Sequence, residues 1–166
     1  RSSDTSKPYH YWWLKRGTEE TLAYDFDQAY TVSGVEVYWL DFDHYDGNFR
    51  VPASWKLYYK DGDSWKEVEA TTPYTTTKDA YNRLDFKPVK TTGLKIAAQL
   101  QKGESGGVLE WKVIPAQHNT TVGGLSVFGN KPPTYISKHT LRNIPGSAIR
   151  CTPSCLIPVL SFPYPA

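Results

Sequence analysis

Apolar and polar residues alternate in short runs between residues 20 and 114, and turn-forming residues separate one run from the next. In the five residues from Val35 to Trp39, the first, third and fifth side chains are apolar, and four of the five are β-branched or aromatic. Such alternation is typical of strands with one buried face, and no stretch has the spacing of a long amphipathic helix. The pattern predicts strands near residues 21–27, 33–40, 54–60, 64–69, 80–87, 93–100 and 107–114.

Glycine-containing segments supply the clearest turn signals. Gly62 lies within the polar segment from Lys60 to Ser64, where a hairpin needs a residue that tolerates positive φ. A second loop covers residues 102–107. Short strands at this spacing predict an all-β fold, either an antiparallel β-sandwich or a jelly roll. The tryptophans on the strand pattern, which we expect in the core, are Trp39, Trp55, Trp65 and Trp111.

Residues 115–166 differ in composition from residues 1–114. Seven prolines fall between Pro132 and Pro165, and both cysteines lie in the same tail. Proline lacks the N–H that a central strand must donate, so the tail is a poor candidate for sheet structure. We therefore expect one β-sandwich domain over 1–114 and a proline-rich basic extension over 115–166, which is a linker, an extension or an added remnant.

Composition narrows the class of protein. Aromatic residues make up 14 % of the chain and hydrophobic residues 39 %, which is enough for a core. The net charge is +2, but residues 131–166 hold four basic residues and no acid, so the remainder carries −2. A near-neutral body lacks the concentrated basic face of a nucleic-acid binder. No apolar run approaches the ~18 residues of a membrane-spanning helix, and the opening residues do not form a signal peptide.

Catalytic motifs are missing from the sequence. No Gly-x-Ser-x-Gly, P-loop or His-Glu-x-x-His pattern occurs. Asp41 and Asp43 form a pair of carboxylates of the kind that flanks a glycosidic bond. Acids are common in loops, however, and the four histidines have no ligand spacing. The sequence therefore favours a binding module over an enzyme.

Four segments of the chain together form a recognisable sequence pattern. Strand patterns at 22–26 and 32–39 precede the segment from Arg50 to Trp65, which reads Arg-x-Pro-x-Ser-Trp and then Asp-Gly-x-x-Trp. The segment from Gly107 to Val113 closes the series. In this order the segments resemble the discoidin, or coagulation factor 5/8 type C, family. That resemblance implies a galactose-binding-like jelly roll, a fold used by many carbohydrate-binding modules.

A closer resemblance involves Trp12-Trp13, Lys15 to Thr18 and Ser105 to Val113. These residues are similar to the C-terminal accessory domain of bacterial β-L-arabinofuranosidase-like glycoside hydrolases. The similarity implies a catalytic glycoside hydrolase domain in the parent chain and an extracellular or periplasmic bacterial location. It also implies a plant cell-wall oligo- or polysaccharide ligand, such as xylan or an arabinan- or galactose-containing glycan. Family members begin with a further strand, which we expect to be incomplete in this chain.

A sugar site needs an aromatic platform and a few fixed polar groups. In this family, ligands bind loops at one end of the sandwich, which here are loops 9–17, 41–50, 71–80 and 101–106. Loop 41–50 is the richest in rings and polar groups, with Tyr45 and Phe49 as stacking rings. Arg50 is equally suited to a structural ion pair. The expected carbohydrate-binding residues are Trp13, Asp41, His44, Tyr45, Asn48 and Arg50.

The resemblance also implies a structural calcium ion, held by hard oxygen ligands. The matching positions are Asp4 in the N-terminal segment and Glu110 on the closing strand. An acid inside an apolar strand needs a partner or a metal unless it faces solvent.

Three other functions remain open. A structural accessory domain would bury its aromatic loops against a catalytic neighbour and would expose a large apolar patch when isolated. A discoidin-type adhesion or lipid-surface module would carry apolar spikes ringed by lysine and arginine. A small glycosidase would need two carboxylates in a cleft.

Overall fold

The described residues of this computed structural model form strands and loops, without a helix. None of them therefore belongs to a helix that could cross a bilayer. They are residues 2–4, 6, 9–12, 15–116, 121–122, 125–126, 142–144 and 148–150.

The strands fall into a main body and a tail. The main-body strands are β1 (His10–Tyr11), β2 (Glu19–Trp39), β3 (Ser54–Asp61), β4 (Ser64–Glu67), β5 (Tyr81–Gln99) and β6 (Gly107–Pro115). The tail strands are β7 (Thr121–Val122), β8 (Leu125–Ser126), β9 (Arg142–Ile144) and β10 (Ala148–Arg150).

The six main-body strands form one sheet in the order β1-β6-β2-β5-β3-β4, and all neighbours in this order are antiparallel. Strand β10 pairs with β2 in parallel and with β9 in antiparallel fashion, while β7 and β8 pair with each other. The prediction of an all-β, antiparallel fold is therefore confirmed.

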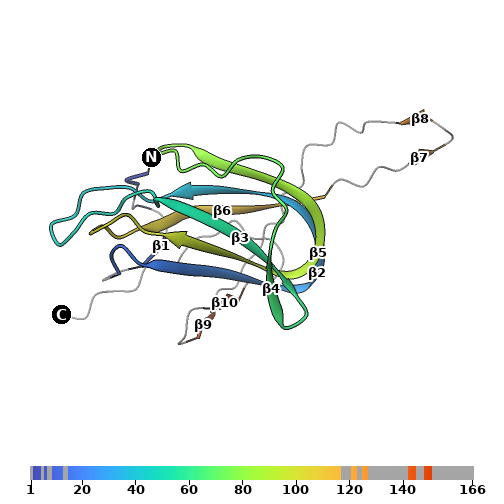
Figure 1. The fold of residues 1–166 in the computed structure, drawn as a ribbon, viewed down its shortest axis with the longest axis horizontal. Helices are drawn as coiled ribbons and strands as arrows, with labels where there is room; N and C mark the ends of the chain where they lie inside the picture. Colours follow the sequence, from blue (N-terminus) through green and yellow to red (C-terminus); the bar gives the residue numbers. More distant parts are fainter. Residues whose placement is uncertain are drawn as a thin grey trace.

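Strands β2 and β5 are long and each covers two of the predicted strands. The first part of β2 pairs with the last part of β5, from Glu19↔Gln99 onward, and the last part of β2 pairs with the first part of β5, ending at Tyr38↔Tyr81. Their register shifts near the middle of β2, between Asp25 and Tyr30. Figure 1 shows that both strands curve at the same end of the molecule, so the sheet folds over on itself.

The two halves of the folded sheet share one core. Tyr24 lies in the first half of β2, and its ring centroid is 4.2 Å from that of Trp111 on β6. Trp39 at the end of β2 contacts Trp55 on β3, with 5.5 Å between ring centroids. Both pairs belong to a single buried cluster. This arrangement fits the β-sandwich, whereas the jelly-roll and galactose-binding-like assignment stays a prediction.

Most of the tryptophan predictions agree with the structure. Trp39, Trp55 and Trp111 are buried in the core cluster, which also contains Trp12. The prediction is wrong for Trp65, which is only half-buried and carries the ammonium of Lys95 over its ring. Trp65 lies on β4, the edge strand of the sheet, directly opposite Lys60 on β3. Its side chain therefore shares the outer face with Lys60 and does not enter the core.

The predicted hairpin at Gly62 is also confirmed. Strands β3 and β4 pair up to Asp61↔Ser64, and Gly62 has a φ of 61° at the first position of the turn. This is the position at which a two-residue type II′ hairpin places glycine. The division of the chain near residue 114 stays a prediction, because most of the proline-rich extension, Cys151 and Cys155 included, lies outside the described residues.

Candidate functional site

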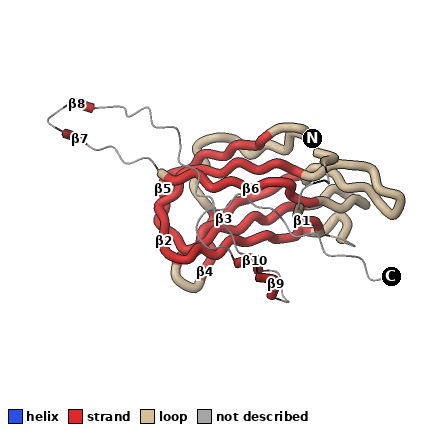
Figure 2. Tube along the Cα trace, turned by 180° about the vertical axis from the view of Figure 1, so that it is seen from behind, coloured by secondary structure: helices blue, strands red, loops and turns tan. Residues whose placement is uncertain are grey.

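Loop 41–50, loop 101–106 and the segment around Gly17 meet at the end of the sandwich opposite to the bend of β2 and β5 (Figure 2). Backbone hydrogen bonds connect them. Ser105 N–H donates to the carbonyl of Asn48, and Arg50 N–H donates to the carbonyl of Ser105, both at 3.0 Å. Gly17 N–H donates to the carbonyl of Glu104 at 3.2 Å. Loop 41–50 is therefore held in place by its neighbours.

Loop 41–50 begins and ends as a small hairpin. Phe42 and Phe49 exchange two backbone hydrogen bonds of 3.0 Å, and their rings stack with centroids 4.8 Å apart. Phe49 is only 3 % exposed and packs with Tyr38, Leu40 and Leu109 in a second buried cluster. The expectation that Phe49 stacks on a ligand is therefore wrong, because its ring supports the loop from below.

The tip of this loop carries an exposed aromatic pair. Tyr45 is 90 % exposed and is the one large hydrophobic side chain with high exposure among the described residues. The His44 ring lies 4.3 Å from the Tyr45 ring, tilted by 35°, and its Nδ1 accepts a 3.3 Å hydrogen bond from Asp46 N–H. His44 thus links the exposed Tyr45 to the partly buried Phe42 and the buried Phe49, whose ring centroids each lie 6.2 Å from that of His44.

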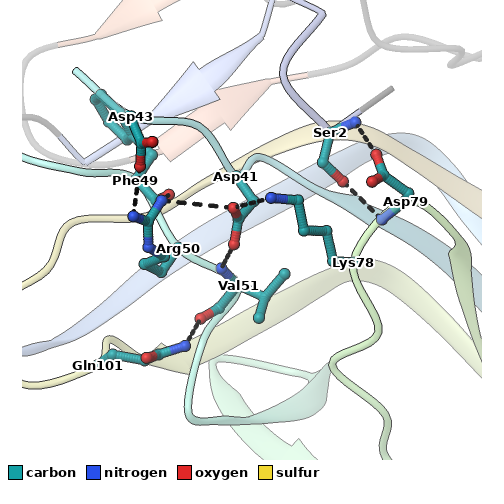
Figure 3. A network of polar contacts seen from close by, with 9 residues as sticks. All are labelled: Ser2, Asp41, Asp43, Phe49, Arg50, Val51, Lys78, Asp79 and Gln101. Atoms are coloured by element: carbon teal, nitrogen blue, oxygen red, sulfur yellow. Dashed lines mark hydrogen bonds and ion pairs between the residues drawn. The ribbon is translucent and has the colours of Figure 1, made fainter.

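Asp41 lies at the base of the loop and is almost fully buried, with 6 % of its side chain exposed. Its Oδ2 accepts a 3.0 Å hydrogen bond from Val51 N–H. Its Oδ1 lies 2.8 Å from Lys78 Nζ and 3.6 Å from a guanidinium nitrogen of Arg50 (Figure 3). Asp41 is thus occupied in holding two loops together, and only limited capacity remains for a sugar hydroxyl.

Arg50 is shared between two carboxylates and the backbone. One guanidinium nitrogen donates to Asp43 Oδ1 at 2.5 Å, and the other donates to the carbonyl of Phe49 at 3.0 Å. The hydrogen bond from Arg50 lowers the pKa of the exposed Asp43 carboxyl. The structural ion pair considered for Arg50 is therefore present, and its charge is already balanced.

The N-terminal segment contributes a residue that the sequence did not indicate. Ser2 is fully buried between two loops (Figure 3). Its carbonyl accepts a 2.9 Å hydrogen bond from Asp41 N–H, and its N–H donates to Asp79 Oδ1 at 2.6 Å. Asp79 is in the left-handed region, with φ 58°, and donates its N–H to Ser2 Oγ at 2.8 Å. No local pattern reveals such a contact between residues 77 positions apart.

The two remaining residues expected to bind sugar are Trp13 and Asn48. Trp13 lies outside the described residues, so its predicted platform role stays a prediction. Asn48 is half-buried, and its carbonyl holds Ser105, which ties loop 41–50 to loop 101–106.

The two predicted calcium ligands have protein partners. Glu110 Oε2 accepts a hydrogen bond from the Tyr81 hydroxyl, and Lys112 lies 3.9 Å from the centroid of the same Tyr81 ring. Asp4 Oδ1 accepts a 3.1 Å hydrogen bond from Ser6 N–H. Within the described part of the chain, no group of three or more Asp, Glu, His or Cys side chains could hold a metal. Glu110 thus has the partner that an acid in an apolar strand needs, and the calcium site implied by the resemblance stays a prediction.

Because Glu110 and Asp4 both have hydrogen-bond partners in the protein, we expect chelation to leave the fold unchanged. Dialysis against EDTA should move the thermal midpoint by less than about 1 °C, since a ligand bound tightly to the native state would raise it measurably. Differential scanning fluorimetry with EDTA and with millimolar CaCl₂ checks this. A calcium-dependent rise that disappears in Glu110→Gln would instead establish Glu110 as a ligand.

No known family model matches this chain, and no solved structure matches it either. The resemblance to the discoidin family therefore rests on the segments quoted above and stays a prediction.

Proposed function

We propose that this domain is a non-catalytic carbohydrate-binding module whose ligand stacks on Tyr45 at the tip of loop 41–50. The observation that carries the proposal is the 90 % exposure of Tyr45 on a loop that is otherwise well anchored. A flat ring exposed at the tip of an anchored loop is accessible to a ligand, and it matches the C–H face of a pyranose. By its resemblance, the module would target an attached glycoside hydrolase to plant cell-wall polysaccharide, raising the enzyme's local concentration.

The surroundings of Tyr45 suit a sugar better than the alternatives. A structural accessory domain needs an extended apolar surface, whereas Tyr45 is a single exposed ring in the described part of the molecule. A lipid-surface module needs a basic rim, whereas Asp43 and Asp46, both exposed, lie on the same loop. Single-site affinity should be weak, because one stacked sugar buries little area.

Affinity gel electrophoresis against xylan, arabinan and galactan tests the proposal. We expect retardation by at least one glycan class, and Tyr45→Ala should weaken that binding at least about tenfold, which corresponds to about 1.4 kcal/mol. The stacking ring is the source of this energy, so Tyr45→Phe is the matched control and should keep most of the affinity.

The variants are informative because Tyr45 is exposed and both should fold normally. If a folded wild-type protein is retarded by none of these glycans, the proposal fails and the structural accessory domain becomes the better account. If Tyr45→Ala binds as well as wild type, sugar binding occurs elsewhere on the molecule.

A further inference from the structure

The outer face of the sheet half formed by β3, β4 and the last part of β5 carries an aromatic and basic cluster. Leu57 and Leu94 point into the core, so their neighbours Tyr58 and Lys95 point outward. Tyr58 is directly opposite Lys95 on β5, and Lys60, two residues further along β3, is opposite Trp65 on β4. The three strands are neighbours in the sheet, and Figure 1 shows β4 near the bend of β2 and β5, at the opposite end of the molecule from the loops of the candidate site.

Lys95 is the centre of this cluster. Its Nζ lies 5.2 Å from the centroid of the Tyr58 ring and 4.9 Å from that of the Trp65 ring. Its side chain is half-buried, and it forms no ion pair with any carboxylate in the described part of the chain. The aromatic faces stabilise the ammonium, but they leave its positive charge without a counter-charge.

The two carboxylates nearest to Lys95 on this face have other partners, since Glu67 pairs with Lys56 at 3.0 Å and Asp25 lies 3.9 Å from Lys60. Across the strands, its neighbours on the outer face are Ala23 on β2 and Tyr58 on β3. Along its own strand, the residues two positions away are Gly93 and Ala97, and all of these neighbours are uncharged. A partly desolvated cation with uncharged neighbours favours an anion from outside the chain.

Gly93 is buried beside Lys95 and lies opposite Asp25 on β2. A Cβ at this glycine would lie 2.6 Å from the backbone oxygen of Tyr24 and 3.5 Å from Cη2 of Trp65. The position therefore requires glycine, and the indole of Trp65 lies next to it. Asp25 on β2 and Lys60 on β3 lie to either side of Gly93, and their charged groups are 3.9 Å apart, so this ion pair spans the glycine.

We propose that Trp65, Tyr58 and Lys95 form a second binding site, on the sheet face, for a uronic acid residue of an acidic polysaccharide. The carboxylate of the sugar pairs with Lys95, and the C–H face of its ring lies against Trp65 or Tyr58. This site uses neither Tyr45 nor loop 41–50. It therefore goes beyond the proposed function and can be tested independently of it.

Titration of the full 166-residue chain with hexagalacturonate, followed by NMR of the ¹⁵N-labelled tryptophan indoles, tests the proposal. We expect the Trp65 indole resonance, assigned through Trp65→Phe, to shift with hexagalacturonate and not with neutral xylohexaose. Raising NaCl from 50 to 300 mM should weaken the affinity several-fold, because the pair with Lys95 is partly exposed to salt.

Lys95→Met is the decisive variant because it keeps the aliphatic stem and removes the charge. The affinity for hexagalacturonate that the Trp65 resonance reports should fall at least about tenfold in this variant. An unshifted Trp65 resonance, or equal affinity of Lys95→Met and wild type, would overturn the site. Binding of neutral glycans through Tyr45 would be unaffected by either result.

Discussion

Replacing Asp41 with alanine is expected to lower the free energy of unfolding by about 2–3 kcal/mol, because a charged acceptor of a backbone hydrogen bond is removed from a nearly buried site. Val51 N–H would lose its acceptor, and Lys78 and Arg50 would lose a shared counter-charge. In a domain of this size the thermal midpoint should fall by about 10 °C. Urea unfolding followed by tryptophan fluorescence measures the change directly.

Two variants separate the parts of this effect. Asp41→Asn keeps an acceptor for Val51 and removes only the charge, so it should retain most of the stability. Lys78→Met removes a partner whose side chain is 54 % exposed, so its effect should be the smallest of the three. Equal stability of Asp41→Ala and wild type would mean that the network does not anchor the loop.

Acidification from pH 6.5 to pH 4 is expected to destabilise the domain by about 3 kcal/mol through His10 alone. Burial lowers the pKa of His10 from 6.5 to about 4, so the folded protein keeps this ring neutral. Its Nε2 is buried without a hydrogen-bond partner among the described residues, and its ring packs against Trp12 at 5.3 Å. Between the two pKa values the unfolded chain binds the extra proton, so stability falls as the pH falls.

The control for this effect is His10→Phe, which keeps an aromatic ring and cannot take up a proton. Its unfolding free energy, measured in urea at several pH values, should be nearly independent of pH between 6.5 and about 5. Carboxyl groups contribute mainly at lower pH and act equally in both proteins. Parallel loss of stability in wild type and His10→Phe would show that His10 is accessible to protons in the folded state.

Alternation in the sequence located the strands well, because each strand has one face on the core. It did not show that two pairs of predicted strands are continuous. The polar residues between Asp25 and Tyr30 look like a loop, yet there the ladder of β2 with β5 shifts register and the strands bend without ending. A bulge of this kind changes the direction of a strand and leaves little trace in its composition.

The candidate site was predictable only in part. Tyr45 was expected to be a stacking ring, and its ring is exposed, although its contact with a sugar stays a prediction. The internal role of Phe49 and the ion pairs of Asp41 with Lys78 depend on contacts between distant loops. Residue types in a loop show that polar groups are available, but pairing within the fold decides which of them remain for a ligand.

The continuity of β2 and β5 affects both the cooperativity of unfolding and the rate of folding. Each strand belongs to both halves of the sheet, so neither half has a complete set of strands without the other. The domain should consequently unfold in one cooperative step, with no stable half-domain produced by truncation. The ladder joins residues as distant as Glu19 and Gln99, so the chain must close long loops before the core forms, and folding should be slow for its length.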